Sequence, residues 1–305
     1  SLGRAAAVAA WGDTITIEGG TYGGPSNRDV DLGSKALTIR SASGDSSSVV
    51  FELAGENGLR FRIDDPDSSI GPRIEGISFA QGDTALAIEG FGFAIPPVAP
   101  PVTFILDGVR ASGNVIGLDT NWSAPTIVRS SFDDNTSHGV RAETVDLRVE
   151  DVDVRGNGLG IEVGNYVPTL DWQTADMELV RMTDNSTGLD VDFDVGTLSV
   201  RNCQLEANSG VGARINSLEG ATVHMSGCSI VQNGAGLEIS GLIEFFAVGV
   251  EVLSNVSDGL VLDAFGTSSF DSLTVTGNGG WGVRRVASTP SGLSRQSKDL
   301  WDTSR

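Results

Sequence analysis

The chain has 305 residues, of which 39% are hydrophobic, and it carries a formal net charge of −20. The hydrophobic content excludes a disordered polypeptide, and no apolar run reaches the 18 or more residues of a membrane-spanning helix. The negative charge disfavours nucleic acid and anionic membrane as partners because like charges repel, and forty glycines without a three-residue period exclude collagen.

The N-terminal residues predict a cap. The Ala-rich segment 2–10 is a helix candidate, and Gly12-Asp13 ends it before a first strand over residues 14–17. Repeat folds need such caps because an open end exposes both the core and a strand edge. We therefore predict a cap over 1–13, a repetitive region over 14–286, and a polar tail or linker over 287–305.

One motif recurs along the rest of the chain. An apolar residue is followed three positions later by Asn. After most of these asparagines comes a Gly-apolar pair, whose apolar member lies four or five residues after the Asn. Fainter versions place Gly82 and Asn114 in the same position. Successive asparagines lie 22 to 28 residues apart, and the regular ones are Asn135, Asn157, Asn185, Asn208, Asn233, Asn255 and Asn278.

Apolar and polar residues alternate on both sides of each Asn, as in Ile161-Glu162-Val163. Period two predicts short strands with one buried face. Such strands bury that face only if successive repeats stack in parallel, about 4.8 Å apart, around one core. We thus expect an all-β parallel solenoid of about ten rungs, a rung being one full turn. The asparagines would form a ladder at one bend, where Asn also tolerates a left-handed backbone.

The chain resembles the pectin-lyase-like right-handed parallel β-helix superfamily. The resemblance is carried by Gly12–Ile17, Gly20-Thr21-Tyr22, Lys35–Ser41, and the Cys-x-x-x-x-Asn rungs at Cys203 and Cys228. It covers residues 5–286 and implies a single-stranded right-handed β-helix. It implies no one activity, because the superfamily includes polysaccharide lyases, glycoside hydrolases, adhesins and tailspikes.

The hydrolase motifs of that superfamily are matched poorly. Asp133-Asp134 and Ser137-His138-Gly139 fall on one rung, whereas the family places such motifs on different rungs, and Asn216 stands where Arg214-Ile215 would be followed by Lys. We therefore expect no catalytic role for these residues.

The alternation predicts columns of outward-facing residues. One column contains Asp119, Arg141, Glu162, Asp190, Arg214, Glu238, Val261 and Arg284, and a second contains Glu143, Asp192, Asn216, Ser240 and Asp263. The simpler interpretation is that opposite charges stack from rung to rung. Only Glu162 and Asp190, with Asp192 near, break that rule. They are the candidate catalytic pair and, with Asp192, the candidate Ca²⁺ site.

The candidate ligand-binding residues are Asp190, Asp192 and Arg214, together with Tyr166 and Trp172. The last two lie on an inserted loop, where their aromatic rings could stack on sugars. A lone loop Trp more often packs against its own domain. Cys203 and Cys228 occupy equivalent inward positions on consecutive rungs, so a disulfide and a pair of buried thiols both fit the sequence.

Three functional interpretations remain open. The leading one is a non-catalytic, secreted or cell-surface module with a structural, adhesive or glycan-contacting role. The alternatives are a polysaccharide lyase or glycoside hydrolase, and a self-assembling filament or sheath subunit. We expect no cofactor other than Ca²⁺. The expected partners are polysaccharide or cell-surface glycan, further domains or identical subunits, and neither nucleic acid nor inserted membrane.

Overall fold

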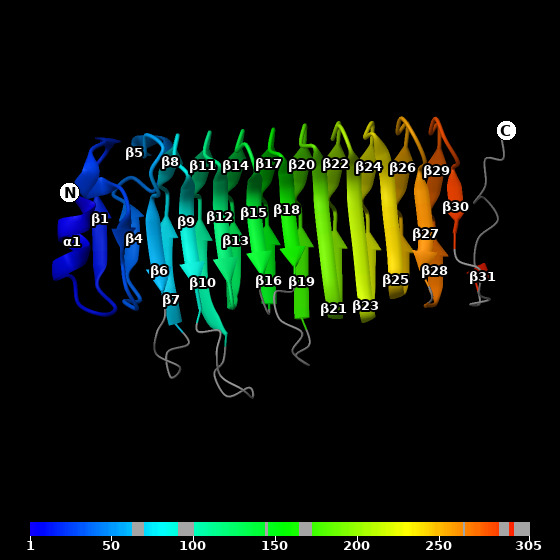
Figure 1. The fold of residues 1–305 in the computed structure, drawn as a ribbon, viewed down its shortest axis with the longest axis horizontal. Coiled ribbons are helices and arrows are strands. Elements are labelled where there is room, and N and C mark those ends of the chain that lie inside the picture. The colour runs from blue at the N-terminus through cyan, green and yellow to red at the C-terminus, as the bar shows by residue number, and fades with distance from the viewer. Residues whose placement is uncertain are drawn as a thin grey trace. The chain divides into compact units, whose positions relative to one another are not determined.

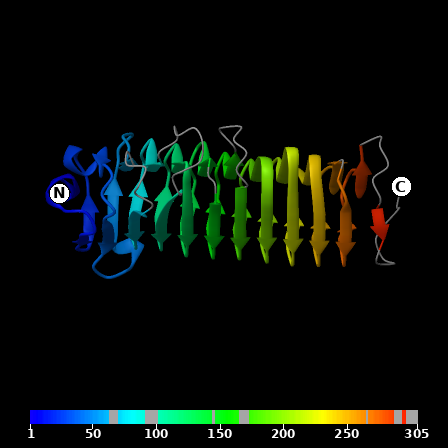
Figure 2. The same cartoon turned by 90° about the horizontal axis from the view of Figure 1, so that it is seen from below.

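A computed structural model describes residues 1–62, 70–90, 101–143, 146–164, 173–264, 266–286 and 293–295. The chain divides into two compact units, Ser1–Gly158 and Leu159–Arg305. In each unit the strands are parallel and stack rung on rung (Figures 1 and 2), and the two units contain about ten rungs. The predicted fold class, a right-handed parallel β-helix, is confirmed. No helix in the described parts of the chain is long and apolar enough to cross a bilayer.

Helix α1 (Leu2–Val8) lies at the N-terminus, as predicted, although it ends two residues earlier than expected. It buries Leu2 and Ala6. Asn27 accepts a hydrogen bond from the backbone N–H of Leu2 at 2.8 Å, and the Lys35 ammonium donates to the carbonyl of Ala6 at 2.7 Å. Both ends of α1 are therefore tied to the first rungs, and Lys35 satisfies a carbonyl that the helix itself leaves unpaired.

Unit 1 has three strands per rung. They form three parallel files, separated by bends at which the chain changes direction, and two short 3₁₀ helices, η1 (Pro25–Asn27) and η2 (Ser46–Ser48), lie among the first rungs. The short-strand file is β2 (Gly20–Tyr22), β5 (Val49–Glu52), β8 (Ser78–Ala80), β11 (Arg110–Ser112), β14 (Ser131–Asp133) and β17 (Asp153–Arg155). The second file is β3 (Val30–Asp31), β6 (Leu59–Arg62), β9 (Thr84–Glu89), β12 (Ile116–Asn121) and β15 (His138–Glu143). The third is β1 (Thr14–Ile17), β4 (Thr38–Ser41), β7 (Ile70–Glu75), β10 (Val102–Asp107), β13 (Ser123–Val128) and β16 (Asp146–Glu150).

Unit 2 repeats this plan, but in three rungs the second and third strands run together as one. The short file is β20 (Arg181–Thr183), β22 (Gln204–Glu206), β24 (Ser229–Val231), β26 (Glu251–Leu253) and β29 (Thr274–Thr276). The merged strands are β21 (Thr187–Arg201), β23 (Val211–Ser226) and β25 (Ala235–Val248). The others are β18 (Leu159–Gly164), β19 (Gln173–Glu178), β27 (Leu260–Ala264), β28 (Ser268–Asp271), β30 (Val283–Arg285) and β31 (Leu293–Arg295).

Strand β31 lies within the segment for which the sequence predicts a polar tail or linker. It pairs in parallel with β28. Parallel pairing therefore continues past residue 286, because the free edge of β28 offers backbone donors and acceptors that another strand can satisfy.

The alternating residues fill the core as expected. The apolar residues that precede each asparagine by three positions, from Phe132 to Val275, are buried, and so are the apolar members of the Gly-apolar pairs, from Leu118 to Leu260. Aromatic rings also stack between rungs in the interior, with Phe51 and Phe79 centroids 5.6 Å apart. Burial of one face of every strand is the main source of stability in this architecture.

The asparagine ladder is present within both units. In unit 2 the side-chain amide and backbone N–H of Asn185 both donate to Oδ1 of Asn208 at 3.0 Å, and Asn208 repeats this toward Asn233. The same pair of bonds joins Asn233 to Asn255 and Asn255 to Asn278. In unit 1 it joins Asn135 to Asn157 and extends back to Asn114.

Each ladder amide also donates to the preceding rung. Asn208 Nδ2 lies 3.1 Å from the carbonyl of Met182, and Asn233 Nδ2 lies 3.0 Å from that of Leu205. Ladder side chains therefore satisfy two backbone groups as well as one another at a bend where strand pairing stops, which is the requirement for burying polar groups there.

The expectation that asparagine supplies the left-handed residue of the bend is wrong. The positive φ occurs one position earlier, at Asp134, Gly156, Asp184, Ala207, Gln232, Ser254 and Gly277. Asn is required for its side chain, which has both a donor and an acceptor, and the residue before it absorbs the change of direction.

Removing one ladder side chain should destabilise the protein strongly. Replacing Asn208 with Ala removes the acceptor of the Asn185 backbone N–H, the donor to the Met182 carbonyl, and one hydrogen bond of each neighbouring ladder amide, so we expect a loss of about 3 kcal/mol in the free energy of unfolding. Chemical denaturation measures it. The matched control is Asn216→Ala, on the solvent-facing side of β23, with an expected loss of about 0.5 kcal/mol. Equal losses in the two variants would contradict the structural role of the ladder.

Burial of the ladder also predicts its glycosylation state. Asn135, Asn185 and Asn255 begin Asn-x-Ser/Thr sequons, yet each is no more than 2% exposed and is hydrogen-bonded on both sides. Expressed in a glycosylating host, the folded protein should carry no sugar at these three positions, and peptide mapping by mass spectrometry reads this directly. A glycan on Asn185 would show that the predicted register of the ladder is wrong.

Candidate functional site

The outward columns lie in the predicted register. Glu162 pairs with Asp190 on the adjacent strand, Asp190 with Arg214, and Arg214 with Glu238, each one strand spacing, about 4.8 Å, from the next. Their inward neighbours, such as Leu189 and Leu237, are fully buried. The sequence-predicted candidates on strands β18 and β21 are therefore brought together on one outer face of unit 2.

Opposite charges pair along the first column. The Arg214 guanidinium lies between two carboxylates, 3.5 Å from Asp190 and 3.2 Å from Glu238. In unit 1 Arg141 lies 2.5 Å from Asp119 in the same way. The expectation that opposite charges stack from rung to rung is confirmed for these pairs, and each such exposed pair contributes about 0–1 kcal/mol.

The second column forms a chain of hydrogen bonds beside the first. Asn216 donates to Asp192 at 2.9 Å, and Ser240 donates to Asn216 at 3.1 Å. The side chains of Asp192, Asn216 and Ser240 are exposed or half-buried. Two parallel polar rows, one charged and one mixed, therefore cross β21, β23 and β25. We call this surface the polar face; it consists of Asp190, Arg214, Glu238, Asp192, Asn216 and Ser240.

Asp190 is the most perturbed carboxyl of the polar face. Burial raises its pKa above the ordinary value of 3.8, the Arg214 charge acts in the opposite direction, and the charges of Glu162 and Asp192 raise it further. Its side chain is 26% exposed, against 45% for Arg214. A carboxyl that is harder to ionise than usual, beside other acidic groups, is a feature that active sites use, although ion-pair networks also produce it.

The candidate Ca²⁺ site does not form a ligand cluster. Among the described residues no three His, Cys, Asp or Glu side chains converge as metal ligands would. Asp190 faces Arg214, and Asp192 accepts from Asn216. The oxygens of Asp190 and Asp192 are thus directed to protein partners on β23, and Ca²⁺ binding stays a prediction. Tyr166 and Trp172 lie outside the described residues.

Cys203 and Cys228 are buried free thiols. Each follows a bend at the start of its rung, and Cys228 Sγ lies 3.3 Å from the carbonyl of Val200 on the preceding rung. A hydrogen bond to Cys228, together with burial, raises the pKa of the Cys203 thiol well above its ordinary value. Both side chains are at most 2% exposed, so these residues belong to the core.

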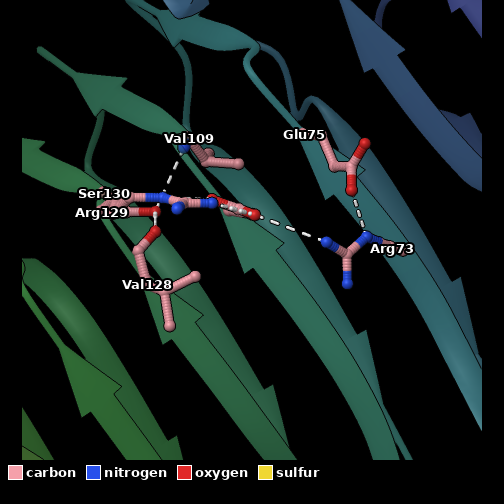
Figure 3. A network of polar contacts seen from close by, with 7 residues as sticks. Arg73, Glu75, Val109, Val128, Arg129 and Ser130 are labelled. Carbon is pink, nitrogen blue, oxygen red and sulfur yellow. Dashed lines mark hydrogen bonds and ion pairs between the residues drawn. The ribbon is translucent and has the colours of Figure 1, made fainter. Parts of the chain in front are cut away.

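Sequence reasoning missed an ion-pair network on the outer face of unit 1. Asp107 on β10 accepts from Arg129 at 2.6 Å and from Arg73 at 3.4 Å, and Arg73 also pairs with Glu75 (Figure 3). Next to it, Ser130 Oγ accepts from the backbone N–H of Val109 and donates to the carbonyl of Val128. These residues lie at the ends of the third file of strands, where the Asn motif gives no register, and a periodic search for Arg and Asp there could have found them.

Comparison with known proteins places the fold in a defined class. No protein-family profile and no curated protein matches the sequence. Among solved structures, the chain is similar to the A-module of mannuronan C-5 epimerase AlgE4 from Azotobacter vinelandii, with a TM-score of 0.64, 13% identity, and coverage of 96% of this chain and 93% of that one. The catalytic unit of a GH87 α-1,3-glucanase from Streptomyces thermodiastaticus has a TM-score of 0.60 and 13% identity, with coverage of 100% of this chain and 67% of that one. The periplasmic alginate epimerase AlgG has a TM-score of 0.58 and 12% identity, with coverage of 90% of this chain and 85% of that one. The protein thus has the pectin-lyase-like parallel β-helix fold.

The perturbed carboxyl gives a pH prediction. Because the folded-state pKa of Asp190 is raised, the folded state holds this proton more tightly, so its contribution to stability is present at low pH and is lost as pH rises through the folded pKa. Relative to the Asp190→Asn variant, the wild type should therefore become less stable as the pH rises through the folded-state pKa of Asp190. NMR titration of the Asp190 carboxyl measures the midpoint directly.

Two substitutions should move that midpoint in opposite directions. Arg214→Gln removes the positive charge that lowers the pKa of Asp190, so the midpoint should rise further. Glu162→Gln removes a negative charge that raises this pKa, so the midpoint should fall. A shift in the same direction in both variants would mean that the local charges do not act as the geometry indicates.

Proposed function

We propose that the protein is a β-helix module that binds polysaccharide through the polar face and does not cleave it. The observation that supports this proposal most directly is the arrangement of two hydrogen-bonded rows side by side, Asp190–Arg214–Glu238 and Asp192–Asn216–Ser240, on consecutive strands. Rows of this kind present donors and acceptors repeatedly along the direction in which the rungs stack.

The chemistry of the polar face suits a hydroxyl-rich ligand. Carboxylates accept hydrogen bonds from sugar hydroxyls, the Arg214 guanidinium donates to them, and the Asn216 amide and Ser240 hydroxyl do both. The side chains already bond to one another, so they are held in place before a ligand arrives, which lowers the entropic cost of binding. A chain of sugars can therefore contact several rungs at once.

The position of Arg214 argues against catalysis between Asp190 and Glu238. These carboxyls lie two strand spacings, about 10 Å, apart, close to the range for an inverting glycosidase. The Arg214 guanidinium, however, contacts both of them and occupies the space that substrate and water would need. Arg214 instead neutralises the pair, as a structural or binding residue does.

An enzymatic function is the second candidate. Glu162 and Asp190 lie on adjacent strands in register, about 5 Å apart at the backbone, and the pKa of Asp190 is raised by burial as expected for a general acid. The similar solved structures include alginate epimerases and an α-1,3-glucanase, all named for action on polysaccharides. At 12–13% identity these proteins support the fold, and the enzymatic candidate depends on the Glu162–Asp190 geometry.

We also propose an extracellular or cell-surface location. A polysaccharide ligand would be met there, and one similar structure is described as periplasmic. Detecting the native protein by cell fractionation and surface labelling checks this part of the proposal.

Binding and cleavage are separated by one experiment. The full chain is tested by affinity electrophoresis and calorimetry against soluble neutral polysaccharides (dextran, starch, β-glucan, galactomannan) and against alginate and polygalacturonate, with and without Ca²⁺. We expect binding to at least one neutral polysaccharide, weakened about tenfold in the double variant Arg214→Ala, Asn216→Ala, because two sets of donors are lost. Glu75→Ala, on the outer face of unit 1, is the control and should bind normally.

The same samples are assayed for new reducing ends and for unsaturated uronates. The proposal expects neither product. Product formed by the wild type and lost in Glu162→Gln or Asp190→Asn would replace it with the enzymatic function, and absence of binding to every polysaccharide would exclude the binding function.

A further inference from the structure

A second, aromatic feature lies on the outer face of unit 2, on the later part of the merged strands. After the register shift between Ser217 and Ala221, the alternation of buried and exposed residues resumes on β23. His224 on β23 and Phe246 on β25 are then register partners, and their rings stack with centroids 5.0 Å apart and planes 15° apart.

This stack differs from the other aromatic pairs of the protein. Phe51 and Phe79 are at most 1% exposed and fill the core, as cross-strand aromatic pairs commonly do. His224, in contrast, is exposed and Phe246 is half-buried, and both point outward from the sheet. Core packing therefore does not explain why two aromatic rings occupy this column.

The neighbours of the stack leave the outer ring faces open. In the same column Ser199 precedes His224 and Ser269 follows Phe246. A serine side chain is too short to cover an aromatic ring on the adjacent strand. One ring face of His224 and one of Phe246 are thus uncovered, and each lies above a hydroxyl that can bond to a ligand.

The nearest large polar side chain is fixed beside the stack. Arg201, two residues beyond Ser199 on β21, pairs with Asp176 and Glu178 at 3.0 Å each, and it also donates to Ser199 Oγ at 3.1 Å. On the β25 side the adjacent outward residues are Glu244, which is exposed, and Val248, which is 51% exposed. On β23 the adjacent outward residues are Thr222 and Ser226, so the surface around the rings carries small hydroxyl side chains and has Glu244 as its acidic border.

We propose that the His224–Phe246 pair is a stacking subsite for the pyranose rings of a neutral polysaccharide. This inference rests on the proposed polysaccharide-binding function and adds a second contact region and a ligand class to it. The C–H-bearing face of a pyranose is apolar and packs on an aromatic ring, while its hydroxyls reach the flanking Ser199 and Ser269. Glu244 disfavours a uronate, because two carboxylates would then approach each other.

Three substitutions test the subsite in the full chain. Phe246→Leu keeps an apolar side chain but removes the ring, and should weaken binding of the neutral polysaccharide that the wild type binds best by about tenfold. Phe246→Tyr keeps the ring and should bind within about twofold of the wild type. Trp281→Ala removes an exposed aromatic ring elsewhere in unit 2, 67% exposed, and should change nothing. Calorimetry gives the affinities, and thermal unfolding verifies that each variant is folded.

The outcomes separate this inference from the function on which it rests. If the wild type binds no polysaccharide, the proposed function fails and the subsite with it. If the wild type binds and Phe246→Leu binds equally well, or if Trp281→Ala weakens binding as much as Phe246→Leu, the subsite alone is overturned. It is also overturned if alginate binds more tightly than every neutral polymer, or if Phe246→Leu changes only the association state in analytical ultracentrifugation, which would assign the rings to a protein interface.

Discussion

Every functional feature described above depends on the way the Asn side chains join one rung to the next. Within each unit, a ladder amide such as that of Asn208 donates to the following asparagine and to a carbonyl of the preceding rung, and a ladder oxygen such as Oδ1 of Asn233 accepts two hydrogen bonds. Strand pairing alone leaves the polar groups of a buried bend unsatisfied, and it tolerates slippage of register, which would turn inward residues outward. The ladder fixes register at one point in each rung. Residues that follow it in matching register therefore form straight columns, and the polar face consists of two such columns, whereas the aromatic pair follows a register shift.

Much of the fold could be predicted because its periodicity is written in short-range patterns. The spacing of Asn185, Asn208 and Asn233 identified the repeat, and the alternation after each Gly identified the buried residues. Three features could not be predicted. The left-handed residue before each asparagine varies between Asp, Gly, Ala, Gln and Ser, so no single residue type marks it. The second and third strands merge in β21, β23 and β25 across register shifts that no recurring motif marks. The pairing of β31 with β28 depends on a strand edge that is not adjacent in the sequence.

The candidate site was predicted in part for the same reason. Asp190 and Arg214 come immediately after a Gly-apolar pair and Asp192 follows two residues after Asp190, so the motif fixes their direction, and the structure brings them together. His224 and Phe246 follow a register shift, after which counting from the Asn no longer gives the face. Arg73, Asp107 and Arg129 lie on strands preceded by segments of unequal length, so their proximity is a tertiary property. The proposal of ligand contact without chemistry rests on the paired charges of the polar face, and the proposal of a sugar as that ligand rests on the outward rings of His224 and Phe246.

The most direct test of this account is a cross-linking measurement of register on the polar face, in a Cys203→Ala, Cys228→Ala background. Adjacent parallel strands place the Cα atoms of Asp190 and Arg214 about 4.8 Å apart, inside the range that a disulfide spans, whereas Asp190 and Asn216 are offset by two residues and fall outside it. Under mild oxidation the double substitution Asp190→Cys, Arg214→Cys should cross-link rapidly, and Asp190→Cys, Asn216→Cys should not. Preferential cross-linking of the second pair would show that the rungs do not stack in the register on which the columns depend.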